Sequence, residues 1–230
     1  MRRLFCYMAV LVWLTGCDQT GRLTYQAYRA LDHGRYQQAV EGYRQVLAID
    51  PDYPNANYNL GRAYLALKQT ESALTAFDEA VRQDPLNPRV LLERALAHEQ
   101  ADQPELAERD HLKVTNLAPD WLPGWQSLAE LQMRQGKPEV ALQTSERGLH
   151  RLPRASLLLR LRAQAMYELD KFADSEVAFG KALEADHGDL LAMVGRARAR
   201  IALNKLELAA EDLANAQQIE PENPAALLVR

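Results

Sequence analysis

Residues 54–87 read PNANYNLGRAYLALKQTESALTAFDEAVRQDPLN, and this stretch decides the fold. Apolar residues recur in it at three- and four-residue steps, which is typical of amphipathic helices. Proline cannot donate the helical hydrogen bond and restricts the residue before it, so Pro85 predicts the end of a helix. The landmarks of the stretch are Leu60, Gly61, Tyr64, Ala73, Phe77, Ala80 and Pro85.

The landmarks return at a fixed step of 34 residues. Proline stands at Pro51, Pro85, Pro119, Pro153 and Pro221, with His187 in the one missing place. The same step joins Ala39, Ala73, Ala107, Ala141, Ser175 and Ala209. In this phase the chain divides, without an insertion, into six units: 20–53, 54–87, 88–121, 122–155, 156–189 and 190–223.

This spacing resembles the tetratricopeptide repeat (TPR) family, whose pattern is W-x-x-L-G-x-x-Y…A-x-x-x-F…P. The fourth unit adds Trp125-x-x-Leu128-Ala129 to the match. The resemblance implies an all-α, right-handed solenoid of six helix–turn–helix repeats, forming one array over 17–223. Each repeat buries its apolar face against its neighbours.

Prolines and glycines place the helix ends inside the repeats. Pro104 and Pro138 stand where a second helix begins, in the first turn that proline tolerates. Gly34 and Gly136 predict the turn between the two helices of a repeat. Residues 224–230 start a further helix and form a short C-terminal stub with exposed leucines. We expect either a sufficient cap or a surface for self-association at this end.

The N-terminal residues have the features of a targeting signal. Arg2 and Arg3 precede an apolar stretch from Leu4 to Leu14, as in a secretory leader. Leu14-Thr15-Gly16-Cys17 resembles a bacterial lipobox, which implies a lipoprotein signal peptide over 1–16 and lipidation of Cys17. The alternative is an ordinary cleaved leader. Asp18 resembles the signal for retention in the inner membrane, so we expect a lipid anchor there with the chain facing the periplasm.

Composition and motifs argue against several functions. A formal net charge of −4 opposes a generally basic nucleic-acid-binding surface. The chain lacks the phosphate-loop, dinucleotide, zinc-protease and serine-hydrolase motifs, so we expect no enzyme and no cofactor beyond the lipid. His98 and His111 take the family's Tyr and Phe places, which predicts two imidazoles inside the packing of the third unit; a metal or pH-sensitive pair is the alternative.

The resemblance also implies where a partner binds. TPR ligands commonly lie along the concave surface formed by the first helix of each repeat. The groove positions that we expect to contact a partner are Tyr25, Tyr28, Tyr58, Asn59, Arg62 and Arg89. Tyrosine and arginine dominate binding hot spots. Tyr58 and Asn59 also fit the repeat consensus, so a purely structural role stays open for them. The same positions of the last two units hold Arg160, Leu161, Gln164, Tyr167, Val194, Arg198 and Ile201.

These observations predict a lipid-anchored, non-catalytic scaffold that binds envelope proteins or peptides. The resemblance points to assembly factors for pili, secretion, exopolysaccharide export or the cell wall. One alternative is a receptor for a glycan or peptidoglycan strand, in which tyrosines stack on sugars. Another is a pilotin-like escort of an outer-membrane channel. The carboxylate clamp of chaperone-binding TPR domains is missing, since Glu93 stands where that clamp needs a cation.

Overall fold

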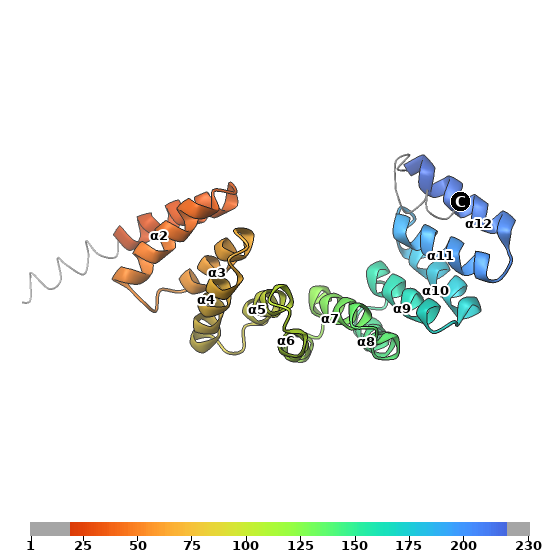
Figure 1. Ribbon diagram of the computed structural model, residues 1–230, viewed down its shortest axis with the longest axis horizontal. Coiled ribbons are helices and arrows are strands. Elements are labelled where there is room, and N and C mark those ends of the chain that lie inside the picture. Colours follow the sequence, from red (N-terminus) through yellow and green to blue (C-terminus); the bar gives the residue numbers. More distant parts are fainter. Residues whose placement is uncertain (1–18, 220–230) are drawn as a thin grey trace, which may run out of the picture. The chain divides into compact units, whose positions relative to one another are not determined.

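The computed structural model describes residues 19–219, and all regular structure in that range is helical (Figure 1). The predicted leader, the C-terminal stub, Cys17 and Asp18 lie outside the described residues. Within 19–219, no helix combines the length and the apolar character needed to cross a lipid bilayer. The all-α TPR fold predicted from the sequence is confirmed, since antiparallel helix pairs follow one another along the chain.

The chain forms two compact units that meet between Leu117 and Ala118 in the sequence. Unit 1 holds a helix over 19–32 and then α2 (Tyr36–Ile49), α3 (Ala56–Ala66), α4 (Thr70–Gln83), α5 (Pro88–Gln100) and α6 (Pro104–Leu117). Unit 2 holds α7 (Leu122–Arg134), α8 (Pro138–Arg151), α9 (Ser156–Glu168), α10 (Phe172–Ala185), α11 (Leu190–Ala202) and α12 (Leu206–Ile219).

Each unit has its own apolar core, built from the repeat landmarks. In unit 1, Ala73 and Phe77 are completely buried between α3, α4 and their neighbours. In unit 2, Trp125, Ala129 and Phe179 belong to one buried cluster. Small residues at the helix crossings let the helix axes approach, so large side chains from the next helix fill the remaining space.

The turn inside each helix pair uses one residue with a left-handed backbone. Gly34 and Gly136 have φ angles of 71° and 68°, which confirms the two turns expected at these glycines. Four further turn residues adopt the same conformation at the same 34-residue step: Lys68, Asp102, Asp170 and Asn204. The backbone requirement therefore recurs in all six pairs, although only two of them satisfy it with glycine.

Lys68→Gly is expected to raise the free energy of unfolding by about 0.5–1 kcal/mol, because glycine carries no Cβ penalty at a φ of 58°. Gly136→Ala is the matched opposite case and should lower it by about 1 kcal/mol, since an added Cβ there meets no atom within 4 Å and only the backbone strain changes. Urea unfolding followed by circular dichroism measures both values. Equal signs for the two variants would contradict this account.

Two buried Arg–Asp pairs join the helices of a repeat. In unit 1, Arg94 Nε and Nη2 donate to Asp110 at 2.7 and 2.9 Å. In unit 2, Arg196 Nε and Nη2 donate to Asp212 at 2.9 and 2.6 Å. The two pairs stand three repeat lengths apart and join the last helix pair of each unit. Such two-pronged contacts fix the angle between two helices.

Candidate partner-binding surfaces

The first helix of each repeat lies on the inner face of its unit. In unit 1, α3 packs on α5 as well as on α2 and α4. In unit 2, α9 packs on both α7 and α11. The second helices of the described repeats make no comparable contact with one another. The repeats are therefore closest together along their first helices, which makes this face the concave one within each unit.

On the inner face of unit 1, the structure brings together three side chains from α3 and α5. The guanidinium carbon of Arg62 lies 5.7 Å from the centre of the Tyr58 ring. Arg62 Nε lies 3.8 Å from Glu93 Oε1. The Tyr58 ring also approaches Phe77, at 6.3 Å between ring centres. Tyr58 is half-buried and lies against both Arg62 and Phe77, which reduces the entropy that it would lose on binding.

The electrostatics of this cluster follow from its burial. Burial raises the pKa of the Glu93 carboxyl, and the nearby Arg62 guanidinium partly offsets the effect. Burial also raises the pKa of Tyr58, and the Glu93 charge adds to the rise, while Arg62 and Arg89 oppose it. Arg89 therefore lies within electrostatic reach of Tyr58. Its own side chain is exposed at the start of α5, where Asn87 caps the helix by accepting from the Arg89 backbone N–H at 3.1 Å.

The tyrosines of helix 19–32 are exposed on its surface. The exposed fraction is 62% for Tyr25 and 51% for Tyr28. Tyr28 raises the pKa of the buried Tyr43 and Arg62 lowers it, so both groups lie within electrostatic range of Tyr43. Tyr28 and Arg62 therefore lie in the same part of unit 1. Asn59, the next predicted residue, is half-buried on α3.

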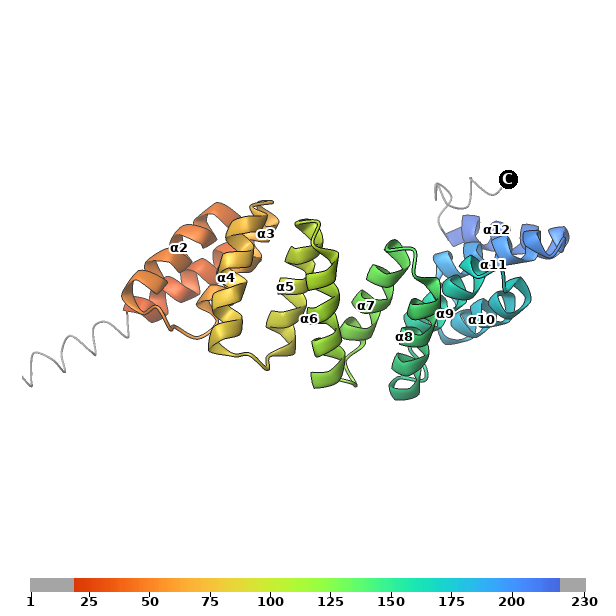
Figure 2. The ribbon, with the colours of Figure 1, turned by 60° about the horizontal axis from the view of Figure 1, so that its bottom comes forward.

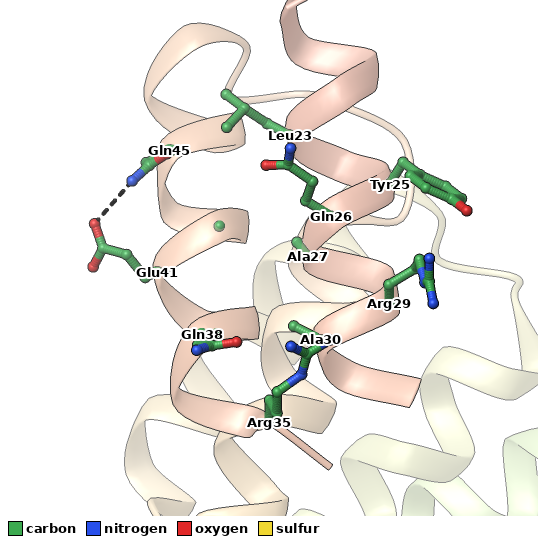
Figure 3. A pocket seen from close by; sticks show the side chains of 11 residues that line it. Leu23, Tyr25, Gln26, Ala27, Arg29, Ala30, Arg35, Gln38, Glu41 and Gln45 are labelled. Carbon is green, nitrogen blue, oxygen red and sulfur yellow. Dashed lines mark hydrogen bonds between the residues drawn. The ribbon is translucent and has the colours of Figure 1, made fainter. Parts of the chain in front are cut away.

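Tyr25 lies at the edge of a surface pocket. A pocket of about 560 Å³ lies over the first helix pair, lined mainly by polar side chains and by Ala27, Ala30 and Gly42. Figure 3 shows Tyr25 and Arg29 on the side of their helix turned away from α2, while Glu41 and Gln45 project from α2 itself. Gln45 donates to Glu41 at 3.1 Å. The structure therefore places Tyr25 at the rim of this hollow.

Unit 2 holds a pocket that our sequence reasoning did not select. It has a volume of about 240 Å³ and is lined by Arg160, Gln164, Tyr167, Glu168, Phe179, Leu191, Val194, Gly195 and Arg198. Five of these residues are among the groove residues named above for the last two units, but the prediction favoured the N-terminal half of the array. Leu161, another groove position, is buried in the core.

Gly195 forms the floor of that pocket together with Phe179. A Cβ placed on Gly195 would lie 2.3 Å from Phe179 Cζ, far closer than atoms can approach. The ring of α10 therefore occupies the space that a side chain on α11 would take. The sequence does carry a signal for this contact, which is Gly195 itself. A glycine inside a predicted helix, rather than at its end, often has a packing reason.

His98 and His111 differ in burial and bond to different side chains. His111 is fully buried, as predicted, and its Nε2 lies 2.8 Å from Glu99 Oε1. His98 is only half-buried, and its Nδ1 lies 2.8 Å from Gln103 Oε1. Across residues 19–219, no three His, Cys, Asp or Glu side chains gather as a metal site would require.

Comparisons with known proteins agree with this architecture. Two family models, both described as tetratricopeptide repeat, match residues 30–95 and 127–189. Tetratricopeptide repeat protein 6 of Homo sapiens is 32% identical over 28% of this chain, and the STIP1 homolog of Dictyostelium discoideum is 32% identical over 40% of it. The matches span only 12% and 16% of those two proteins.

Solved structures with the same fold match over most of their length. PilW, described as a widely conserved type IV pilus biogenesis factor, superposes with a TM-score of 0.73 at 18% identity, over 91% of this chain and 97% of its own. PilF of Pseudomonas aeruginosa gives 0.72 at 16% identity, over 93% and 97%. YrrB, a TPR protein with an unusual peptide-binding site, gives 0.62 at 15% identity, over 82% and 97%. Both units of this chain are therefore built from tetratricopeptide repeats.

Proposed function

We propose that this chain is a non-catalytic interaction scaffold that binds extended protein segments along the inner faces of its two units. The observation that carries the proposal is a tyrosine–arginine stack on each inner face. Arg62 lies over Tyr58 at 5.7 Å in unit 1, and Arg198 lies over Tyr167 at 5.0 Å in unit 2. Each stack offers a flat apolar surface beside a cation with five N–H donors.

The proposal extends to the membrane. The lipobox-like sequence ending at Cys17 supports covalent lipid attachment, and Asp18 favours retention at the inner membrane with the repeats in the periplasm. Several acyl chains hold a protein firmly, because each buried methylene contributes about 0.8 kcal/mol. A tethered scaffold would meet its partners close to the membrane surface.

Among envelope machines, a type IV pilus is the assembly that we favour. PilW is described as a pilus biogenesis factor, and it matches this chain over nearly its full length. Fold similarity at 18% identity supports a similar arrangement of helical repeats. The experiment below tests whether this chain acts in pilus assembly.

The test is in vivo crosslinking of the full-length chain in a bacterial host that makes type IV pili, followed by separation of the inner and outer membranes. We expect pilus-assembly proteins to copurify from the inner-membrane fraction. Tyr28→Ala combined with Arg62→Ala should abolish their recovery, since both side chains are exposed on the inner face of unit 1. Arg82→Ala, an exposed arginine on the second helix α4, is the matched control and should change nothing.

Other outcomes each overturn one part of the proposal. Recovery from the outer membrane would contradict the assignment of Asp18 and favour an escort of an outer-membrane channel. Copurification of glycan without protein would replace the scaffold by a polymer receptor. Cys17→Ser should release the chain from membranes, and unchanged fractionation of this variant would rule out the lipid anchor.

A further inference from the structure

We infer that the pocket between α9, α10 and α11 receives one large apolar side chain of an extended peptide, with an acidic side chain of the same peptide bound by Arg198. This inference rests on the proposed function and names its ligand chemistry in unit 2. A volume of about 240 Å³ lies below the roughly 300–1,000 Å³ of small-molecule sites. The space therefore suits a single anchoring side chain, as in protein–protein hot spots.

The apolar half of the pocket is preformed. Phe179 is held against the bare backbone of Gly195, and Val194 is buried beside it. Leu191 stands at the rim with 53% of its side chain exposed. An incoming aromatic or branched side chain would cover the exposed part of Leu191 beside the buried Phe179 ring, and burial of that apolar surface favours binding by about 25 cal/mol per Å².

The charged groups around the pocket are not equivalent. Arg160 Nε donates to Asp189 Oδ2 at 3.0 Å, and Asp189 Oδ1 accepts from the Ala192 backbone N–H at 3.0 Å. This carboxylate caps α11 and neutralises Arg160. In the part of the chain that the structure describes, the contact recorded for the Arg198 side chain is with the Tyr167 ring. The Arg198 charge is therefore balanced by no bonded carboxylate and is available to a ligand.

Glu168 limits the choice of ligand further. It lines the same pocket, at the end of α9, so a basic ligand group would find one acid there while an acidic group would find Arg198. The Tyr167 ring orients Arg198 without neutralising it, which favours the acidic group. In an extended peptide, residues two positions apart share a face. The predicted motif is thus a large apolar residue with Asp or Glu two positions away.

The acid is a side chain rather than a chain terminus. Terminal carboxylates are commonly captured by free backbone N–H groups. Among the lining residues only Leu191 lies in the first turn of its helix, and the others lie deeper in α9, α10 and α11, where backbone N–H groups bond within the helix, so the lining offers no group of several free N–H donors. A side-chain carboxylate of the peptide can bind to the Arg198 guanidinium alone.

The test is selection of a random linear peptide library on the full-length chain in detergent, with the peptides fused at their carboxyl ends so that no carboxyl terminus is free. We expect enrichment of an apolar residue and an acid two positions apart. Arg198→Gln should remove the acid preference and weaken a selected peptide roughly tenfold, the size of one charge-assisted hydrogen bond. Leu191→Ser should weaken the apolar preference and retain the acid.

Arg147→Gln is the matched control, because Arg147 also stacks on an aromatic ring of unit 2, Trp125 at 5.5 Å, but does not line the pocket. It should leave selection unchanged. Enrichment of basic peptides, no enrichment, or equal loss in the Arg147 and Arg198 variants would overturn the inference. A library with free carboxyl ends that alone gives the motif would assign the site to chain termini instead. The membrane and crosslinking results are independent of all these outcomes, so the proposed function can fail or stand separately.

Discussion

Replacing Asp212 with alanine is expected to lower the free energy of unfolding of unit 2 by about 3–5 kcal/mol, the usual cost of removing one partner from a buried ion pair. Asp212 is 1% exposed and binds two arginines. Arg196 donates to it twice, and Arg200 Nη1 donates at 2.8 Å. Without the carboxylate, Arg196 loses both of its hydrogen bonds to Asp212, while Arg200 keeps only its contact with Glu176 of α10, at 3.1 Å, among the acidic side chains it bonds.

Urea unfolding of the full chain, combined with hydrogen exchange, measures this effect. Exchange should accelerate mainly in α11 and α12, because the lost contacts join these two helices. Glu211→Ala, one residue away on the exposed side of α12, is the control and should stay within about 0.5 kcal/mol of the parent chain. Equal behaviour of the two variants would show that the pair contributes nothing to the repeat.

Raising the pH from 10 to 12 is expected to lower the stability of unit 1 by roughly 2 kcal/mol through Tyr43 alone, most of the roughly 2.7 kcal/mol that its full pKa shift carries. Tyr43 is fully buried, and no protein group in the described range bonds to its hydroxyl. Burial raises its pKa to about 12, an effect that Arg62 opposes. In the unfolded chain tyrosine loses its proton near pH 10. Above that pH the folded state holds more protons than the unfolded state, so stability falls.

Tyr43→Phe supplies the control for this pH dependence. The variant should match or exceed the stability of the parent chain at pH 8, because removing an unbonded hydroxyl leaves no other group without a partner. Between pH 10 and 12 its stability should fall less steeply. Tyr58, whose pKa is also raised, accounts for a remaining slope of the same sign. Identical slopes for parent and variant in urea unfolding would contradict the assignment to Tyr43.

The fold was predictable because its signals are local and repeat. Pro104 and Pro138 begin α6 and α8 as expected, since a proline at the first helical position needs no hydrogen-bond donor. The turn at Lys68 escaped prediction because a lysine gives no sign of a left-handed backbone. The only sequence signal for this turn is that Lys68 stands 34 residues after Gly34. The Arg94–Asp110 pair was also missed, although its spacing of 16 residues recurs at Arg196 and Asp212.

The candidate sites were less predictable, since they depend on contacts between repeats. Repeat positions named Tyr58 and Arg62 correctly as neighbours on one face, because both lie on α3 one helical turn apart. They could not show that Tyr25 also lies at the rim of a pocket over the first helix pair. The pocket of unit 2 depends on the approach of Phe179 to Gly195, from two helices in different repeats. Rules for repeat positions describe one helix at a time, whereas the approach of Phe179 to Gly195 depends on how two helices pack.

The Arg–Asp pairs have a consequence for how such a chain can change in length. Both partners of each pair lie within one 34-residue segment, Arg94 with Asp110 and Arg196 with Asp212. Unequal recombination that duplicates or deletes a whole segment therefore carries both charges together and strands neither in the protein interior. Point mutation is the greater hazard, because it can change one partner at a time. Arrays of this kind can thus gain or lose a whole repeat without separating the two charges of such a pair.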